Sequence, residues 1–230
     1  MEVQASTVRR APIILPAPRW TVLLIGAGLL LSVIGFNNST LLPGPPTAVI
    51  DAVTSSTLVR DGITSTLAAG TVLRVGDEVR VGADGRATIA IGTSEVRLAP
   101  GAELRIDVVS TDVVILRQLG GRIFHRVAAA AETTYTVETS SLDWTTHGAA
   151  FDVDRSTSAD GETVTMTAVR DAVQLSGPNL LAVIAEGRLA IVRLGAEEPE
   201  MTTREALPAE LQDPWLTGNS VLNGPGYSVP

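Results

Sequence analysis

The stretch GTVLRVGDEVRVGADGRATIAIGTSEVRLAPGAELRI, residues 70–106, decides the fold class of this chain. Apolar and polar side chains alternate along residues 86–91, which is the period of two that a half-buried strand requires. Asp84-Gly85 lies between two such runs and predicts a tight hairpin turn, because this dipeptide tolerates positive φ. Further turn signals follow at Gly76-Asp77, Gly92-Thr93 and Pro100-Gly101. Their regular spacing predicts an all-β domain of many short strands.

The same rhythm continues as far as residue 194. We predict strands near residues 57–59, 72–75, 78–81, 86–91, 95–98, 103–109, 113–119, 122–127, 135–138, 149–154, 163–170, 172–175, 180–184 and 188–192. Turns are expected at Ser158-Ala159-Asp160-Gly161, Ser176-Gly177-Pro178-Asn179 and Glu186-Gly187. No helical pattern lies between the strands, which argues against βαβ units and a parallel sheet. Two arrangements remain open, a rolled sandwich of antiparallel strands and a β-solenoid-like stack.

The order of these residues resembles a known family. Residues 76–104 read G-D-x-V-x-V-G-x-D-G-R-A-x-I-x-I-G-x-S-x-V-R-L-x-P-G-A-x-L, which is similar to the FecR domain. Residues 114–127 (VILRQLGGRIFHRV) resemble that family's strand, glycine, strand segment. Residues 142–153 (LDWTTHGAAFDV) resemble its V-x-G-T-x-F-x-V signature, although His147 and Ala149 replace the usual Arg and Thr around Gly148. The resemblance covers residues 50–194 and implies an extracytoplasmic domain of a membrane-anchored signalling protein. Such proteins relay the state of a receptor to a sigma factor.

Residues 20–36 (WTVLLIGAGLLLSVIGF) contain no charged side chain. At 1.5 Å per residue they form about 25 Å of helix, just enough to span a bilayer. Arg9, Arg10 and Arg19 precede the segment, so the positive-inside rule places the N-terminus in the cytoplasm and the rest of the chain outside. Two alternatives are a cleaved signal peptide, with Val33 and Gly35 at the cleavage site, and a buried helix of a globular core.

The predicted organisation therefore has five parts. Residues 1–19 are a short cytoplasmic N-terminus, 20–36 a transmembrane helix, 37–48 a Pro-rich linker and 49–195 the FecR-like all-β extracytoplasmic domain. Residues 196–230 are an extension, in which residues 203–211 (TREALPAEL) predict a short capped helix interrupted by Pro208, and residues 219–230 predict a frayed tail. Localisation at the cell membrane, with a single crossing, follows.

Charge restricts the classes of partner. The chain has a net charge of −8, and 24 of its 25 acidic residues follow residue 36. An acidic domain is repelled by nucleic acid, so no nucleic-acid partner is expected. Residues 1–19 are too few to bury a core, so we expect an envelope or membrane protein partner to bind the extracytoplasmic domain.

Candidate chemical groups are few. The chain has no cysteine and two histidines, His125 and His147, without the close spacing of a metal site. Ser141, Asp143 and His147 lack the surroundings of a catalytic triad. Asp152 and Asp154 alternate with Phe151, so we predict that both carboxylates face solvent while Phe151 enters the core.

The sequence thus offers no catalytic, metal-binding or cofactor-binding residue, and we do not expect an enzyme. Phe124, Tyr135 and Phe151 lie in predicted strands, and these three and Trp144 are expected to be buried rather than to form a sugar-binding platform. The first functional hypothesis is a binding or signal-relay module of the cell envelope. The alternative is a structural or adhesive envelope domain with no signalling role.

Overall fold

A computed structural model describes residues 46–128, 130, 132–195 and 198–220. The chain divides into two compact units, Met1–Gly44 and Pro45–Pro230. The predicted membrane segment at residues 20–36, most of the linker, and the tail at residues 221–230 lie outside the described residues. Within the described residues, no helix is long and apolar enough to cross a membrane.

The second unit is built of strands, which confirms the all-β prediction. The strands are β1 (Ala48–Arg60), β2 (Ile63–Thr66), β3 (Val72–Leu73), β4 (Glu78–Ile91), β5 (Ser94–Leu98), β6 (Glu103–Val109), β7 (Val113–Arg126), β8 (Thr134–Thr139), β9 (Leu142–Thr146), β10 (Ala150–Ser158), β11 (Gly161–Arg170), β12 (Val173–Gly177), β13 (Leu180–Ile184), β14 (Arg188–Leu194) and β15 (Glu200–Glu205). Two short helices follow, α2 (Pro208–Leu211) and α3 (Pro214–Ser220). The sequence patterns did not indicate β2, β9 and β15.

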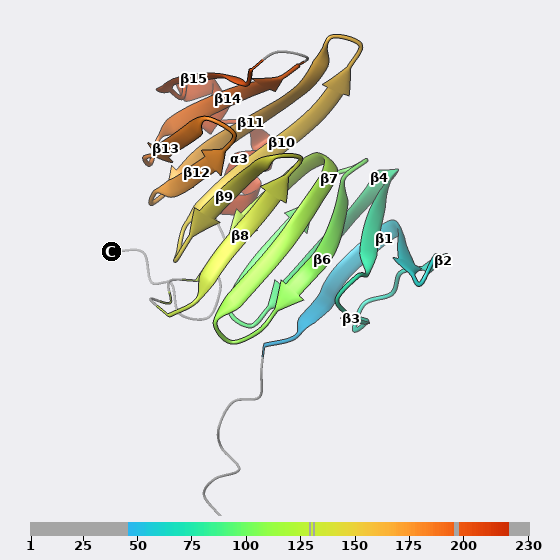
Figure 1. The fold of residues 1–230 in the computed structure, drawn as a ribbon. Coiled ribbons are helices and arrows are strands. Elements are labelled where there is room, and N and C mark those ends of the chain that lie inside the picture. Colours follow the sequence, from blue (N-terminus) through green and yellow to red (C-terminus); the bar gives the residue numbers. More distant parts are fainter. Residues whose placement is uncertain (1–45, 129, 131, 196–197, 221–230) are drawn as a thin grey trace, which may run out of the picture. The chain divides into compact units, whose positions relative to one another are not determined.

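All fifteen strands belong to one sheet (Figure 1). Its longest path runs β13-β12-β9-β8-β7-β10-β11-β14-β15, and β1 to β6 join it through β5 and β6, which both pair with β4 and with β7. Because β5 and β6 bridge the same two long strands at different places, the sheet rolls around a core. Neighbours are antiparallel except β7 and β8. This pairing agrees with a rolled sandwich rather than with the parallel stacking of a solenoid.

The prediction of a hairpin at Asp84-Gly85 is wrong, because the single strand β4 continues through that dipeptide. The β1 partners jump from Thr54, opposite Arg86, to Ser56, opposite Val81, which leaves a bulge in β4. A Cβ atom at Gly85 would lie 2.6 Å from the Ser55 carbonyl oxygen. Glycine is therefore needed here for the close approach of two backbones rather than for a turn.

A second glycine explains why two predicted strands, residues 113–119 and 122–127, form the single strand β7. Gly121 has a φ of 74°, a left-handed conformation that L-residues rarely adopt. A Cβ atom there would lie 2.6 Å from Ala102 Cα. The strand therefore bends at this point without ending, and its two halves pair with different neighbours, β6 and β5.

Other predicted turns are confirmed. Ile91 pairs with Ser94 across Gly92-Thr93, and Ser158 pairs with Gly161 across the hairpin between β10 and β11. Near the predicted turn at Gly76-Asp77, the Asp77 carboxylate accepts hydrogen bonds from Arg60 Nε at 2.8 Å and from the Arg74 backbone N–H at 2.7 Å. This buried carboxylate therefore ties the start of β4 to β1.

The core contains the large side chains that the alternation predicted. Tyr135, Trp144 and Phe151 are almost completely buried and belong to one continuous apolar cluster. The Trp144 indole N–H donates to Thr139 Oγ1 at 3.0 Å, so its polar atom is satisfied inside the core. Phe124 is also buried, but it belongs to a separate small cluster on the outer face of the sheet.

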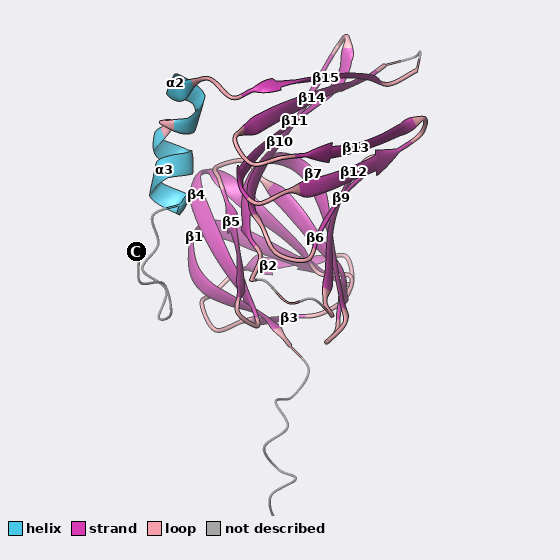
Figure 2. Ribbon diagram, turned by 90° about the vertical axis from the view of Figure 1, so that its left-hand side faces the viewer, coloured by secondary structure: helices cyan, strands magenta, loops and turns pink. Residues whose placement is uncertain are grey.

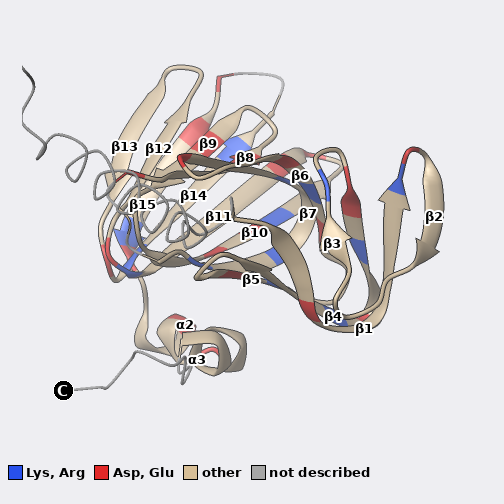
Figure 3. Cartoon of the chain, turned by 90° about the horizontal axis from the view of Figure 1, so that it is seen from below, with Lys and Arg blue, Asp and Glu red and all other residues tan. Residues whose placement is uncertain are grey.

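Charged side chains on the strands alternate in sign. Figure 3 shows basic and acidic positions interleaved along the sheet. Asp107, for example, accepts from Arg105 Nε at 2.7 Å and from Arg117 Nε at 2.8 Å. Such partly exposed pairs contribute little each to stability, but they fix the neighbours of each strand.

The end of the described chain differs from the prediction. Residues 203–205 belong to β15, and Pro208 begins α2 instead of interrupting a helix. Proline is well suited to a first helical turn because the N–H it lacks would have no helical partner. The frayed tail predicted from residue 219 is also wrong at its start, since Asn219 and Ser220 belong to α3. Both helices lie outside the strands (Figure 2).

Candidate functional site

The two histidines lie in unlike surroundings. His125 is fully buried, with Nδ1 2.9 Å from the Tyr135 hydroxyl and its ring stacked 4.9 Å from the ring of Phe151. Burial lowers the pKa of His125 to about 3, so the imidazole is neutral at physiological pH. Its packing is that of a core residue.

His147 is exposed in the bend between β9 and β10. Its Nδ1 lies 3.1 Å from the Thr133 carbonyl oxygen. Within the described residues, no hydrogen bond joins His147 to Ser141 or Asp143, and no three His, Asp or Glu side chains are grouped so as to hold a metal ion.

Asp152 departs most clearly from the sequence prediction. Asp154 is exposed, as predicted, but Asp152 is only 4% exposed. Its Oδ2 accepts from Arg122 Nε at 2.7 Å and its Oδ1 accepts from the Trp215 indole N–H at 2.8 Å. Alternation gave the correct face of β10 for Asp152, but α3 covers that face.

The contacts of α3 with the sheet are both polar and apolar. Leu216 packs with Phe124 and Ala150 in the small outer cluster, which Trp215 and Val169 complete. Polar contacts lie at both ends of the helix. Arg122 Nη1 is 3.1 Å from Asp213 Oδ2, and Arg97 Nη1 donates to Asn219 Oδ1 at 3.0 Å. We call this set of contacts between residues 213–219 and the sheet the C-terminal clasp.

The Asp213-Pro214 sequence explains why a helix begins here. The Asp213 carboxylate accepts from the Trp215 backbone N–H at 2.7 Å, and proline occupies the first helical position. These signals were present in the sequence. The sequence did not indicate where the helix docks, because its contacts Phe124 and Asp152 lie far away along the chain.

Burial dominates the electrostatics of Asp152. It raises the pKa of this carboxyl from 3.8 to about 6, although Arg122 and the Trp215 indole both favour the ionised form. Burial of the ionised carboxylate in the clasp therefore costs free energy, and the group takes up a proton as the pH falls through about 6.

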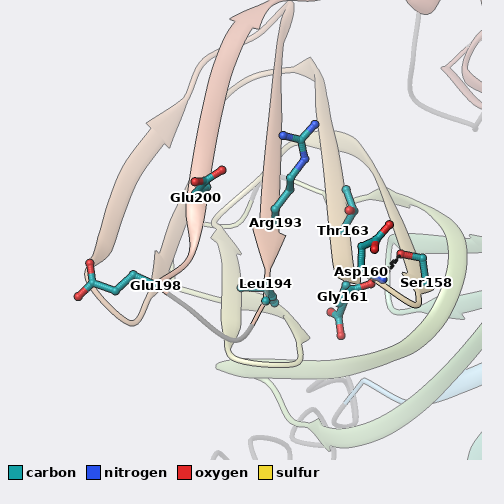
Figure 4. A pocket seen from close by; sticks show the side chains of 10 residues that line it. Ser158, Asp160, Gly161, Thr163, Arg193, Leu194, Glu198 and Glu200 are labelled. Atoms are coloured by element: carbon teal, nitrogen blue, oxygen red, sulfur yellow. Dashed lines mark hydrogen bonds between the residues drawn. The ribbon is translucent and has the colours of Figure 1, made fainter.

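A polar cavity of about 430 Å³ lies at the turn between β10 and β11, beside β14 (Figure 4). The charged side chains at its wall are mainly acidic, namely Asp160, Glu162, Glu198 and Glu200 beside the one basic residue Arg193. Glu162 is held by Arg155 at 2.9 Å and by Ser140 at 2.8 Å.

No protein-family model matches the chain. No curated protein matches it either. Similar solved structures include two crystal structures, at 1.65 and 2.50 Å resolution, of a "putative anti-sigma factor" from Parabacteroides distasonis ATCC 8503. They are 18% and 17% identical to this chain, both with a TM-score of 0.52, over 61% of this chain and 65% and 64% of theirs. The likeness establishes a shared fold.

Proposed function

We propose that this chain is a non-catalytic binding or signal-relay module of the bacterial cell envelope, built on a FecR-like domain. The observation that carries the proposal is the fold shared with the two structures of a "putative anti-sigma factor". The segments that resemble the FecR domain support it, since residues 76–104 supply β4, β5 and the start of β6, and residues 114–127 supply most of β7. These segments lie side by side around one core.

The anchoring of the module is a second part of the proposal. Residues 20–36 cross the membrane once, with the N-terminus in the cytoplasm, because Arg9, Arg10 and Arg19 precede an uncharged run. Alkaline phosphatase fused after Pro230 is then active in cells, since it folds outside the cytoplasm. Mass spectrometry of the mature protein distinguishes an anchor from a cleaved signal peptide: loss of residues 20–36 contradicts the anchor.

The partner is proposed to be an envelope or membrane protein that contacts the all-β unit. Two strands present large apolar side chains to solvent, with Leu181 75% exposed on β13 and Ile63 70% exposed on β2. Strand β13 ends the longest path through the sheet, and its one strand partner among the described residues is β12. An edge of this kind can accept a strand from another protein.

Photocrosslinking in cells tests this function. A photoreactive residue is placed at Leu181 or at Ile63, with the exposed Asp154 as a control position away from these edges. A relay module is crosslinked to a defined partner, and deletion of residues 46–220 changes transcription. If transcription is unchanged and no defined protein is crosslinked, the alternative of a structural or adhesive domain replaces the proposal.

A further inference from the structure

Strand β13, residues 180–184 (LLAVI), is apolar on both of its faces. Leu180 and Ala182 pack against the core cluster, and Ile184 is buried in it. Leu181 and Val183 alternate with them and are 75% and 69% exposed. A strand with one face in water normally alternates apolar and polar residues, whereas an unbroken apolar run is typical of a strand that is covered on both faces. The sequence of β13 therefore suits a covered strand, although its outer face is open.

The backbone of the two exposed residues also points away from the sheet. The turn between β12 and β13 consists of residues 178–179, so Gly177 and Leu180 flank it. In a two-residue hairpin the flanking pair exchanges hydrogen bonds, and so does every second pair after it. Leu180 and every second residue after it therefore bond to β12. The N–H and C=O groups of Leu181 and Val183 face the free edge.

The other end of the same path through the sheet differs in charge. Strand β15 ends the path there, and it contains Glu200, Arg204 and Glu205. Charged side chains on an edge strand discourage the addition of another strand. Strand β13 contains no charged residue. Of the two strands that end this path, only β13 is therefore suited to strand addition.

Acidic side chains lie at both ends of β13. Beyond its last residue, the exposed Glu186 accepts from the Asp171 backbone N–H at 3.1 Å. Arg170, which lines a cavity with Glu186, pairs with Asp171 at 3.4 Å, so the three charges sum to −1. At the turn end, Asn179 Nδ2 donates to the exposed Glu198 at 3.4 Å. Antiparallel pairing with a second copy of β13 would set these two acidic ends against each other, which disfavours self-association.

We propose that β13 binds an antiparallel strand of a partner protein, in which apolar residues alternate and Lys or Arg stands at each end. This inference rests on the proposed function, because it specifies the strand that the edge described there accepts. Two apolar side chains of the added strand lie beside Leu181 and Val183. Its basic ends lie near Glu186 and Glu198, so that the charges of strand and edge are complementary.

A designed peptide is the probe. Acetyl-RTVTVTR-amide can set its two valines opposite Leu181 and Val183 and its arginines near the acidic ends. In the ¹⁵N-labelled full chain it shifts the backbone N–H signals of Leu181 and Val183 in a saturable manner and slows their hydrogen exchange. Acetyl-ETVTVTE-amide, the charge control, binds about tenfold more weakly at low salt. If the basic peptide does not bind, or if both peptides bind equally, the proposal is overturned.

Methylation of the peptide backbone tests the mode of binding. The two valine nitrogens face β13 in this register, whereas the nitrogens of the second and fourth residues face away. Methylation of both valine nitrogens therefore abolishes binding. Methylation of the other two nitrogens leaves binding as it is for the parent peptide. Equal binding by the two methylated peptides contradicts the addition of a strand.

Charged variants of the protein test the position of the site. Leu181→Lys and Val183→Lys each abolish binding of the basic peptide, because they give β13 the kind of charge that β15 carries. Val75→Lys makes the same change at a residue that is 68% exposed outside β13, and it binds as the parent does. Parent-like binding by both β13 variants overturns the proposal.

Hydrogen exchange of the parent without peptide covers the case in which a variant does not fold. The N–H groups of Leu181 and Val183 exchange fast and that of Ala182 slowly; slow exchange at all three contradicts a free edge. The crosslinking experiment above separates this inference from the proposed function. A crosslink from Leu181 in cells without peptide binding removes this inference alone. Peptide binding without a crosslinked partner or a change in transcription supports the strand site and removes the signalling role.

Discussion

Replacing Asp152 with asparagine is expected to stabilise the protein at neutral pH. Asp152 is almost fully buried in the C-terminal clasp, where burial raises its pKa from 3.8 to about 6. Each tenfold change in proton affinity corresponds to about 1.4 kcal/mol, so the ionised form is disfavoured in the folded state by about 3 kcal/mol. Asparagine has nearly the same shape and can still accept from the Trp215 indole, but it carries no charge to bury.

The pH dependence gives the sign of the effect. A group whose folded-state pKa is raised contributes stability that is fully present below its unfolded pKa, here 3.8, and is lost as pH rises through about 6. The advantage of Asp152→Asn is therefore about 1–3 kcal/mol at pH 7.5 and disappears near pH 4, where the parent carboxyl is protonated.

Urea unfolding of the unit Pro45–Pro230, followed by circular dichroism between pH 4 and pH 7.5, measures this difference. Asp154→Asn is the matched control, because it removes the same charge two residues away at an exposed position and should change stability little. A variant less stable than the parent at pH 7.5 would refute the reasoning. It would mean that pairing with Arg122 outweighs the cost of burial.

Three further changes probe the core and the bends. Phe151→Ala should lower the unfolding free energy by about 3–5 kcal/mol, because the ring is fully buried against His125; an unchanged urea midpoint would show that the ring is not in the core. His125→Phe should flatten the loss of stability on acidification from about pH 6.5 towards pH 3, since the folded state keeps this imidazole neutral and protonation favours unfolding; an unaltered pH profile would contradict burial of His125. Gly85→Ala should destabilise the domain by about 1–3 kcal/mol, because its Cβ would meet the Ser55 carbonyl, whereas Gly120→Ala has open space and should not; equal effects of the two would argue against the bulge in β4.

The sequence by itself determined the fold class and most strand positions. Period-two alternation places Phe151 and Val153 on one face of β10, and the structure buries both. Turn residues such as Gly92-Thr93 and Pro178-Asn179 act locally, so their hairpins could be predicted without knowledge of the fold. The same local logic failed at Asp84-Gly85, where glycine serves a contact with Ser55 about thirty residues away along the chain.

Only the tertiary structure decided the environment of the outer face of β10. Alternation specifies which side chains share a face, but it does not specify what covers that face. Asp152 is buried because Trp215 and Leu216 come back to cover it, and those residues lie more than sixty positions later in the chain. Contacts between distant segments create the clasp, and no local pattern of residues encodes them.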